Sequence, residues 1–163
     1  MKTFYLDHAA STPLAAEVAA AMAEVAGQTG NASSQHAAGR VLRDHLDVAR
    51  ETVANELGCL FGEICFTSGG TESGNLALLG LALANPSRRE ILVSASEHHC
   101  LLSPAPVLTR LGITLRTVRA DRYGRIDLTS LQEMASDQTL AIAAMHANNE
   151  LGTTQDIASI AEI

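Results

Sequence analysis

The sequence predicts an α/β fold in which a mostly parallel sheet is flanked by helices. From residue 63 onward, short runs of β-forming residues alternate with segments whose apolar residues have helical spacing. Two of the short runs, residues 90–95 (EILVSA) and 140–145 (LAIAAM), are largely apolar. Strands that are covered on both faces have this composition, so the two runs favour a parallel sheet between helices.

Two helices are predicted before the alternating region. The first covers residues 14–26, with Thr12 and Pro13 as its cap and first-turn residues and an end near Gly27. A loop rich in Gly, Asn and Ser follows, with the sequence GQTGNASSQHAAGR. Helical spacing of apolar residues then resumes over residues 40–58. That second predicted helix ends at Gly58.

The alternating region contains four predicted strands, residues 63–68, 90–95, 113–118 and 139–147. Helices are predicted after the first strand and, to about Leu111, after the second, and a turn (DRYGR) follows the third. Near the C-terminus, Asp156 is predicted to cap a helix with Ile157 and Ile160 on one side. No helix-ending residue follows, so we expect a domain that is truncated at Ile163.

The composition argues against several classes of protein. The 18 acidic and 11 basic residues give a formal charge of -7, and the basic residues are scattered, which disfavours nucleic acid or an anionic membrane as a partner. Apolar stretches are interrupted well before membrane-spanning length. The three cysteines have no metal-type pairing, which is typical of free thiols in a reducing cytoplasm. With 163 residues and 47% hydrophobic content, one domain is expected.

Polar residues follow three of the predicted strands at the point where each strand ends. These clusters are residues 68–71 (SGGT), 96–99 (SEHH) and 148–150 (NNE). In open α/β sheets, ligands bind outside the C-terminal ends of the strands. The three clusters therefore predict a ligand site at one edge of the sheet.

The glycine turn at residues 68–71 has the features of a small phosphate site. Its glycines let the backbone approach a ligand, and the helix start behind them offers N–H groups and a positive dipole end. The turn lacks a P-loop lysine and the spacing GxGxxG, so a cofactor monophosphate fits it better than a nucleotide. Thr71 would offer a hydroxyl as well as its backbone N–H. The alternative is a tight connection between strand and helix without a ligand.

The other two clusters each admit several interpretations. A histidine of the pair His98 and His99 could stack on an aromatic cofactor and shuttle protons, or the segment could simply be a capped helix start with one exposed histidine. A metal site in EHHC and a Cys100 nucleophile with a histidine base are weaker alternatives. The amide of Asn148 or of Asn149 could bind a ring hydroxyl or a substrate carboxylate, although the two residues could also merely form a turn. His36 and Asn31, in the early loop, are expected to be structural.

Taken together and in order, these segments resemble the class V aminotransferase family, specifically cysteine desulfurases of the nitrogen-fixation and iron–sulfur-cluster type. The resemblance runs nearly end to end. It rests on six segments in the order and approximate spacing of the family: YLDHAASTP, GNASSQHAAGR, EICFTSGGTESGNLAL, SEHHCLLSP, GRIDL and HANNELGTTQDI.

The resemblance implies the N-terminal part of a large domain like that of aspartate aminotransferase, extending over residues 1–163. Residues 1–30 would pack on the small domain or on a dimer partner. The implied cofactor is pyridoxal 5'-phosphate, and the implied reaction converts L-cysteine to L-alanine with transfer of persulfide sulfur for iron–sulfur cluster or thio-cofactor assembly. By position, Gly70 and Thr71 match the phosphate-binding pair of the family, His98 the ring-stacking catalytic histidine, and Asn149 a cofactor-binding asparagine.

This sequence also departs from the family pattern. Its only lysine is Lys2, so no residue matches the Schiff-base lysine, and no cysteine matches the persulfide cysteine. We therefore expect a cytoplasmic chain that is inactive alone and that works with a second copy, a complementing C-terminal chain or both; a sulfur-acceptor protein is a further candidate partner. The alternatives are a non-catalytic interaction fragment of the same fold, a related selenocysteine lyase, or another class V aminotransferase.

Overall fold

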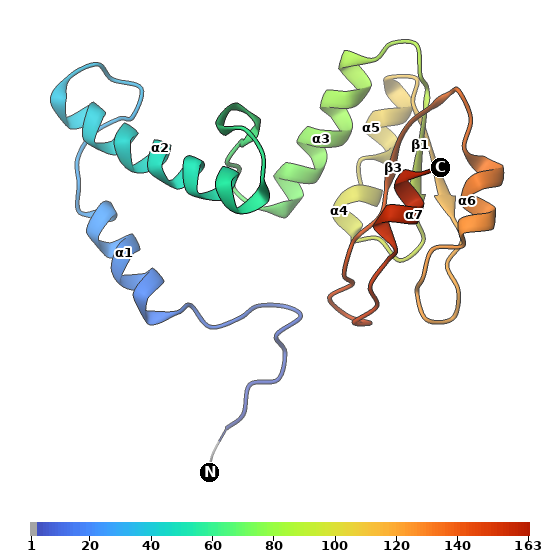
Figure 1. The fold of residues 1–163 in the computed structure, drawn as a ribbon, viewed down its shortest axis with the longest axis horizontal. Helices are drawn as coiled ribbons and strands as arrows, with labels where there is room; N and C mark the ends of the chain where they lie inside the picture. The colour runs from blue at the N-terminus through green and yellow to red at the C-terminus, as the bar shows by residue number, and fades with distance from the viewer. Residues whose placement is uncertain (1–2) are drawn as a thin grey trace. The chain divides into compact units, whose positions relative to one another are not determined.

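The computed structural model describes residues 3–163, so Lys2 lies outside the described residues. The chain divides into two compact units, residues 1–66 and residues 67–163 (Figure 1). Each unit has its own secondary structure. Within the described residues, no helix is long and apolar enough to cross a membrane.

The first unit confirms the two predicted helices, although the N-cap of the first is Ala15, so Thr12 and Pro13 lie before the helix. Helix α1 spans Ala16–Ala26 and α2 spans Ala37–Leu57, followed by a short 3₁₀ helix η1 at Phe61–Glu63. At the start of α2, Nδ1 of His36 accepts a hydrogen bond from the backbone N–H of Gly39. Gly58, with φ of 66°, ends the helix in the left-handed conformation that glycine adopts without strain.

The loop before α2 packs tightly on the first turn of that helix. The backbone N–H of Ser34 donates to the carbonyl oxygen of Asn31 at 2.8 Å, and the Asn31 side chain accepts from the N–H of Ser33. A Cβ atom on Gly39 would lie 2.5 Å from the Ser34 oxygen and 2.7 Å from the Asn31 oxygen. Asn31 therefore holds the loop and His36 caps the helix, in agreement with the structural roles expected for both.

The predicted strand at residues 63–68 is wrong. Its first residue, Glu63, ends η1, and Ile64 has extended backbone angles (φ -92°, ψ 123°) but belongs to no strand. An extended segment becomes a strand only when a neighbour accepts and donates its backbone hydrogen bonds, and no described segment pairs with this one. The rings of Phe61 and Phe66 instead lie 5.1 and 5.6 Å from the guanidinium carbon of Arg50.

The second unit confirms the predicted parallel sheet with flanking helices. Its strand order is β2-β1-β3, and both pairings are parallel. The strands are β1 (Glu90–Ser94), β2 (Thr114–Val118) and β3 (Thr139–Ala143). The helices are α3 (Gly70–Ala84), α4 (His99–Leu102), α5 (Ala105–Arg110), α6 (Leu128–Met134) and α7 (Ile157–Ala161) (Figure 1).

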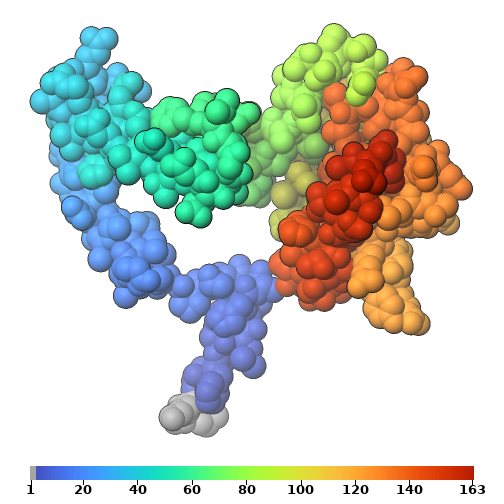
Figure 2. Space-filling view, in the orientation of Figure 1, coloured from blue at the N-terminus to red at the C-terminus, as the bar shows by residue number. Residues whose placement is uncertain are grey.

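Helices cover both faces of the central strand β1. Ile91 packs in one cluster with Leu78 of α3 and Leu108 of α5. Its neighbour Leu92 packs in a second cluster with residues of α6 and α7, because successive side chains of a strand point to opposite faces. Both β1 residues are fully buried. The last part of the chain, coloured red, lies on the surface of this unit (Figure 2).

Three elements differ from the prediction. The helix expected up to Leu111 is two short helices, α4 and α5, because Pro104 caps the start of α5 and its ring cannot continue α4. Helix α6, capped by Asp127, was not predicted. Strand β3 ends at Ala143 and not at residue 147, since the chain beyond it turns and forms an isolated antiparallel bridge between Ala147 and Thr154.

We predict that Gly39→Ala destabilises the chain by about 1–3 kcal/mol, because the added methyl group overpacks a rigid backbone contact. The two oxygens in the way belong to the main chain of the loop and cannot move as a side-chain tip would. Urea denaturation followed by circular dichroism measures the change. Gly62→Ala is the matched control, since a Cβ there meets nothing within 4 Å. Equal stability of the two variants would contradict the packing described for the loop.

Candidate functional site

The four candidate residues, Gly70, Thr71, His98 and Asn149, all belong to the second unit and are all exposed. Two of them, Gly70 and Thr71, form the first turn of α3. His98 precedes α4 in the loop after β1, and Asn149 lies in the loop after β3. Because β1 and β3 are parallel, the loops that follow them leave the same edge of the sheet.

The start of α3 presents backbone N–H groups for which the described residues supply no acceptor. The first intrahelical bond runs from the N–H of Ser73 to the oxygen of Gly69 at 3.0 Å. Within the described part of the chain, the structure gives no acceptor for the N–H groups of residues 70, 71 and 72. The hydroxyl groups of Thr67 and Ser73 form a hydrogen bond of 2.6 Å, which links the two sides of the turn. This helix start can therefore bind an anion.

The carboxylate of Glu72, in the same turn, is engaged by Ser68. It accepts from the Ser68 hydroxyl at 2.6 Å and from the Ser68 backbone N–H at 2.7 Å. These bonds, the hydroxyl first and the backbone second, lower the pKa of Glu72 from its ordinary value of 4.5. Glu72 thus closes the turn by accepting both bonds from Ser68, while the N-cap Gly69 has no side chain to cap the helix.

His98 is the N-cap of α4. Its Nδ1 accepts from the backbone N–H of Cys100 at 3.1 Å, and its own backbone N–H donates to Glu97. The accepting Nδ1 carries no proton, so the neutral ring carries its proton on Nε2. The capped helix start suggested by the sequence is therefore present, and it orients the ring without using Nε2.

Helices α3 and α4 pack against each other, which brings the glycine turn and His98 together. The side-chain amide of Asn75 donates to the carbonyl oxygen of Cys100 at 3.5 Å. A Cβ atom on Gly74 would lie 2.6 Å from Cδ2 of Leu101, so the absence of a side chain at Gly74 permits the close approach. Direct contacts between α3 and α4 consequently hold the first turns of the two helices close to each other.

Asn148 connects the loop after β3 to the loop after β1. Its Nδ2 donates to the carbonyl oxygen of Ser96 at 2.8 Å, and its Oδ1 accepts from the N–H groups of Glu150 and Leu151. The turn interpretation is therefore correct for Asn148. Asn149 is exposed and directly follows this anchor. Its assignment as a cofactor ligand stays a prediction.

Sequence reasoning missed the residues that join the strand ends. The hydroxyl of Ser96 donates to the carbonyl oxygen of Gly124, in the turn after β2, at 2.8 Å. Gln155 donates to the same oxygen at 2.7 Å and accepts from the N–H of Ile126 at 2.9 Å. The only local signal was the glycine of DRYGR, which has φ of 79°. The contacts of Gln155 cross about thirty positions, so no local pattern reveals them.

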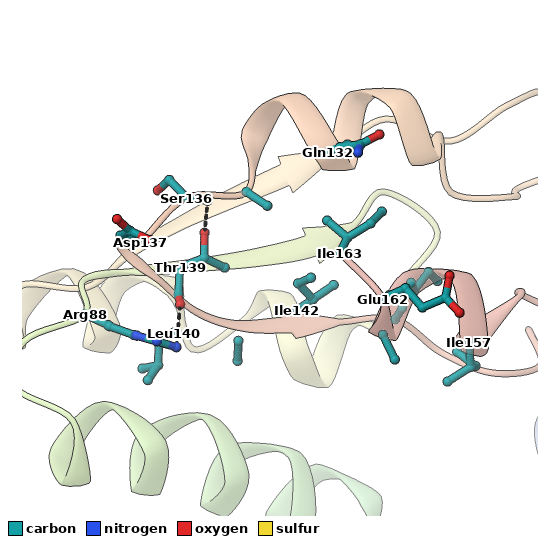
Figure 3. Close-up of a pocket in the computed structure, with 15 residues that line it drawn as sticks. Arg88, Gln132, Ser136, Asp137, Thr139, Leu140, Ile142, Ile157, Glu162 and Ile163 are labelled. Carbon is teal, nitrogen blue, oxygen red and sulfur yellow. Dashed lines mark hydrogen bonds between the residues drawn. The ribbon is translucent and has the colours of Figure 1, made fainter.

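A pocket of about 700 Å³ lies beside the edge strand β3, away from the site residues described above (Figure 3). Ile142, Ile160 and Ile163 supply apolar lining, and Arg88 lies at its margin, where it donates to the oxygen of Thr139. None of the four candidate residues lines it. Among residues 3–163, no cluster of three or more His, Cys, Asp or Glu side chains could hold a metal ion.

We predict that Gln155→Met lowers the unfolding free energy by about 2–3 kcal/mol. Methionine fills a similar volume but cannot make the two hydrogen bonds of Gln155, one from the N–H of Ile126 and one to the oxygen of Gly124. Both of these backbone groups belong to buried residues, so the loss is costly. Gln132→Met, at an exposed position, is the matched control and should change little. Urea denaturation of both variants measures the difference. A Gln155→Met protein as stable as the wild type would contradict the stabilising role of the Gln155 hydrogen bonds.

The lowered pKa of Glu72 predicts an acid-dependent difference between the wild type and Glu72→Gln. A carboxyl whose folded pKa is lowered stabilises the fold above its ordinary value of 4.5, and the contribution is lost as the pH falls through the folded pKa. The wild type should therefore be the more stable protein near neutral pH, and the advantage should shrink in acid. Asp121 and Asp156, whose pKa values are also lowered, are common to both proteins and cancel. Thermal unfolding across the acid range tests this, and a constant difference would contradict it.

Comparison with known proteins agrees with these observations. Residues 4–163 match the family described as aminotransferase class-V. The chain is 42% identical over 161 residues to the cysteine desulfurase IscS of Dictyoglomus turgidum, covering 98% of this chain and 41% of that protein. It is 39% identical to the putative cysteine desulfurase IscS 1 of Bacillus subtilis, covering 100% of this chain and 44% of that protein.

Solved structures show the same likeness. A NifS-like protein matches with a TM-score of 0.90 and 32% identity over 96% of this chain and 43% of its own. SspA in complex with cysteine matches with a TM-score of 0.91 and 34% identity over 98% of this chain and 47% of its own. The chain thus spans less than half the length of these relatives. It belongs to the class-V aminotransferase family, in which it is similar to cysteine desulfurases.

Proposed function

We propose that this chain carries the cofactor-binding first part of a cysteine desulfurase-like enzyme, which converts L-cysteine to L-alanine and releases persulfide sulfur. The observation that supports this most is the joint placement of two helix starts. Helix α3 presents N–H groups without acceptors, and α4, packed against it, begins at an exposed and oriented histidine. One similar solved structure is that of SspA in complex with cysteine, which supports cysteine as the substrate class.

The class-V aminotransferases and their cysteine desulfurases depend on pyridoxal phosphate, and the donors of the α3 turn fit a phosphate monoester. The backbone N–H groups of Gly70 and Thr71, the Thr71 hydroxyl and the positive end of a 15-residue helix dipole are all suited to an anion. A Cβ atom on Gly70 would meet nothing within 4 Å, so the backbone there faces open space. The carboxylate of Glu72, in the same turn, accepts two hydrogen bonds from Ser68 and keeps its negative charge.

His98 and Asn149 would contact the remainder of the cofactor. Pyridoxal phosphate, when bound, supplies an electron-withdrawing ring that labilises bonds at the substrate α-carbon. His98 would lie against the face of that ring, held by its Nδ1 bond to Cys100, and would give or receive a proton at Nε2. Asn149 would donate from its side-chain amide to the ring hydroxyl or the substrate carboxylate.

The remaining chemistry requires groups that this sequence does not contain. Lys2 is its single lysine, so covalent attachment of the cofactor would come from polypeptide other than these 163 residues, as would the cysteine that accepts sulfur. We propose a complementing C-terminal chain, a second copy of this chain or both as the partners, in the cytoplasm, with a sulfur-acceptor protein for iron–sulfur cluster assembly. The chain alone would bind and orient without turning over substrate. A selenocysteine lyase or another class V aminotransferase would use the same turn and the same histidine.

A second candidate function is a non-catalytic interaction module of the same fold. It is favoured by α1, whose Val18, Met22 and Val25 are all exposed on a helix with no buried residue. An apolar stripe of this kind suits association with another protein. A module of this class would dock onto its partner without a functioning phosphate turn, so ligand binding separates the two proposals.

We predict that the chain binds pyridoxine 5'-phosphate, and that Gly70→Ala weakens the binding about tenfold or more without destabilising the fold. Pyridoxine 5'-phosphate lacks the aldehyde, so it cannot react with Lys2 or the N-terminus and reports only non-covalent contacts. Alanine would place a methyl group in the open space before the turn, where the protein itself offers no obstruction. Titration followed by ³¹P NMR measures the affinity, and thermal unfolding measures stability.

Two controls define the outcome of this experiment. Pyridoxine without phosphate should bind much more weakly than its phosphate ester, because it cannot use the α3 turn. Gly80→Ala, later in α3 and also free of contacts within 4 Å, should leave the affinity unchanged. Equal affinity for the two compounds, or no binding by a folded wild-type chain, would contradict the cofactor-binding role and favour the interaction module.

A further inference from the structure

We propose that Asn148 is a positioning residue, which sets the spacing between His98 and Asn149 by joining the two loops that carry them. This inference rests on the proposed function, because it concerns the same site. Asn148 lies one position before Asn149, and the carbonyl oxygen that it binds belongs to Ser96, two positions before His98. A single hydrogen bond of 2.8 Å thus spans 52 positions of sequence between the two proposed contacts of the cofactor ring.

Both ends of the Asn148 side chain are used, and for different purposes. Its Oδ1 accepts from the N–H groups of Glu150 and Leu151 at 2.9 and 2.8 Å, which closes the turn that presents Asn149. Its Nδ2 is the donor to Ser96. Asn148 is half-buried, whereas Asn149 is exposed. The side-chain amide of Asn148 therefore links the conformation of the loop after β3 to the position of the loop after β1.

Ser96 is a suitable anchor because other bonds hold it in place. Its backbone N–H donates to the hydroxyl of Ser94, a residue that is buried at the end of β1, at 3.3 Å. Its own hydroxyl donates to the oxygen of Gly124 at 2.8 Å, and Gln155 holds that same oxygen from the other side. Because Ser96 is fixed to two strand ends, its hydrogen bond to Asn148 can hold the two loops at a set spacing. If Ser96 were held loosely, its loop would move and the spacing would not be set.

Beyond Ser96, the loop that carries His98 has little support. Helix α4 has only four residues, so its own hydrogen bonds cannot hold the start of the helix in one position. Asn75 of α3 contacts Cys100 at 3.5 Å, which is a long hydrogen bond. The Asn148 bond and the Ser96–Gly124 bond, both of 2.8 Å, are consequently the shorter tethers on the Ser96–His98 segment from outside the loop.

Asn148→Asp separates the two uses of the side chain. Aspartate retains an oxygen that can accept from Glu150 and Leu151, but it cannot donate to Ser96. Asn85→Asp is the matched control: Asn85 follows α3 and its Nδ2 donates to the oxygen of Leu81 at 3.0 Å, so the same substitution removes one similar bond elsewhere. Asn148→Ala, which adds no charge, controls for repulsion of an anionic ligand.

The first measurement uses the ligand-free chain. If Asn148 positions the loop, Asn148→Asp and Asn148→Ala should shift the NMR signals of the His98 ring nitrogens and of the Cys100 amide, which report the Nδ1 bond. Asn85→Asp should leave these signals in place. Unchanged His98 and Cys100 signals in both Asn148 variants would overturn the proposal, whether or not the chain binds any cofactor.

The second measurement compares two ligands. Inorganic phosphate reports the α3 turn alone, and pyridoxine 5'-phosphate also reports the ring contacts. Both Asn148 variants should bind pyridoxine 5'-phosphate about tenfold more weakly than the wild type does and bind inorganic phosphate within about twofold of it. An equal loss for both ligands, or no loss for either, would overturn the positioning role. A wild type that binds neither ligand would count against the proposed function, and the ligand-free measurement would then decide the positioning role alone.

Discussion

The structure of the second unit depends on the burial of β1 between two parallel neighbours. Four consecutive residues of this strand, Ile91 to Ser94, are buried, and its apolar side chains enter clusters on both faces of the sheet. Burial on both faces determines the register, because a shift by one residue would exchange the two faces. Since both pairings are parallel, the loops after all three strands leave the sheet at one edge.

This shared edge explains why polar residues that are distant in sequence act together. The packing of α3 on α4 brings the glycine turn to the loop after β1, and hydrogen bonds through Ser96, Gly124 and Asn148 join that loop to the other two. Backbone oxygens are the acceptors in these cross-loop bonds. The loops are therefore held by main-chain geometry as well as by apolar packing, and they carry His98 and Asn149 at exposed positions.

Particular residues show where sequence reasoning succeeded and where it failed. The apolar runs 90–95 and 140–145 indicated buried strands, and Gly58 and Asp156 marked helix ends, because periodicity and capping are local properties. Residues 63–68 have the composition of a strand but lack a pairing partner among the described residues. The positions of His98 and Asn149 after strands followed from the alternation of elements, whereas Gly70 and Thr71 follow an unpaired segment and not the strand that was expected. The linking roles of Ser96, Asn148 and Gln155 did not follow from the sequence.

By itself, the sequence determined the α/β class, the main helices, the polar clusters after β1 and β3 and the resemblance to cysteine desulfurases. These features depend on residue type and spacing along the chain, which can be seen without coordinates. Only the tertiary structure decided which extended runs pair as strands, that α4 and α5 are separate helices, and that Asn148 and Gln155 connect the loops. Strand pairing and hydrogen bonds across 29 to 52 positions depend on the packed fold, because their partners are neighbours in space and not in sequence.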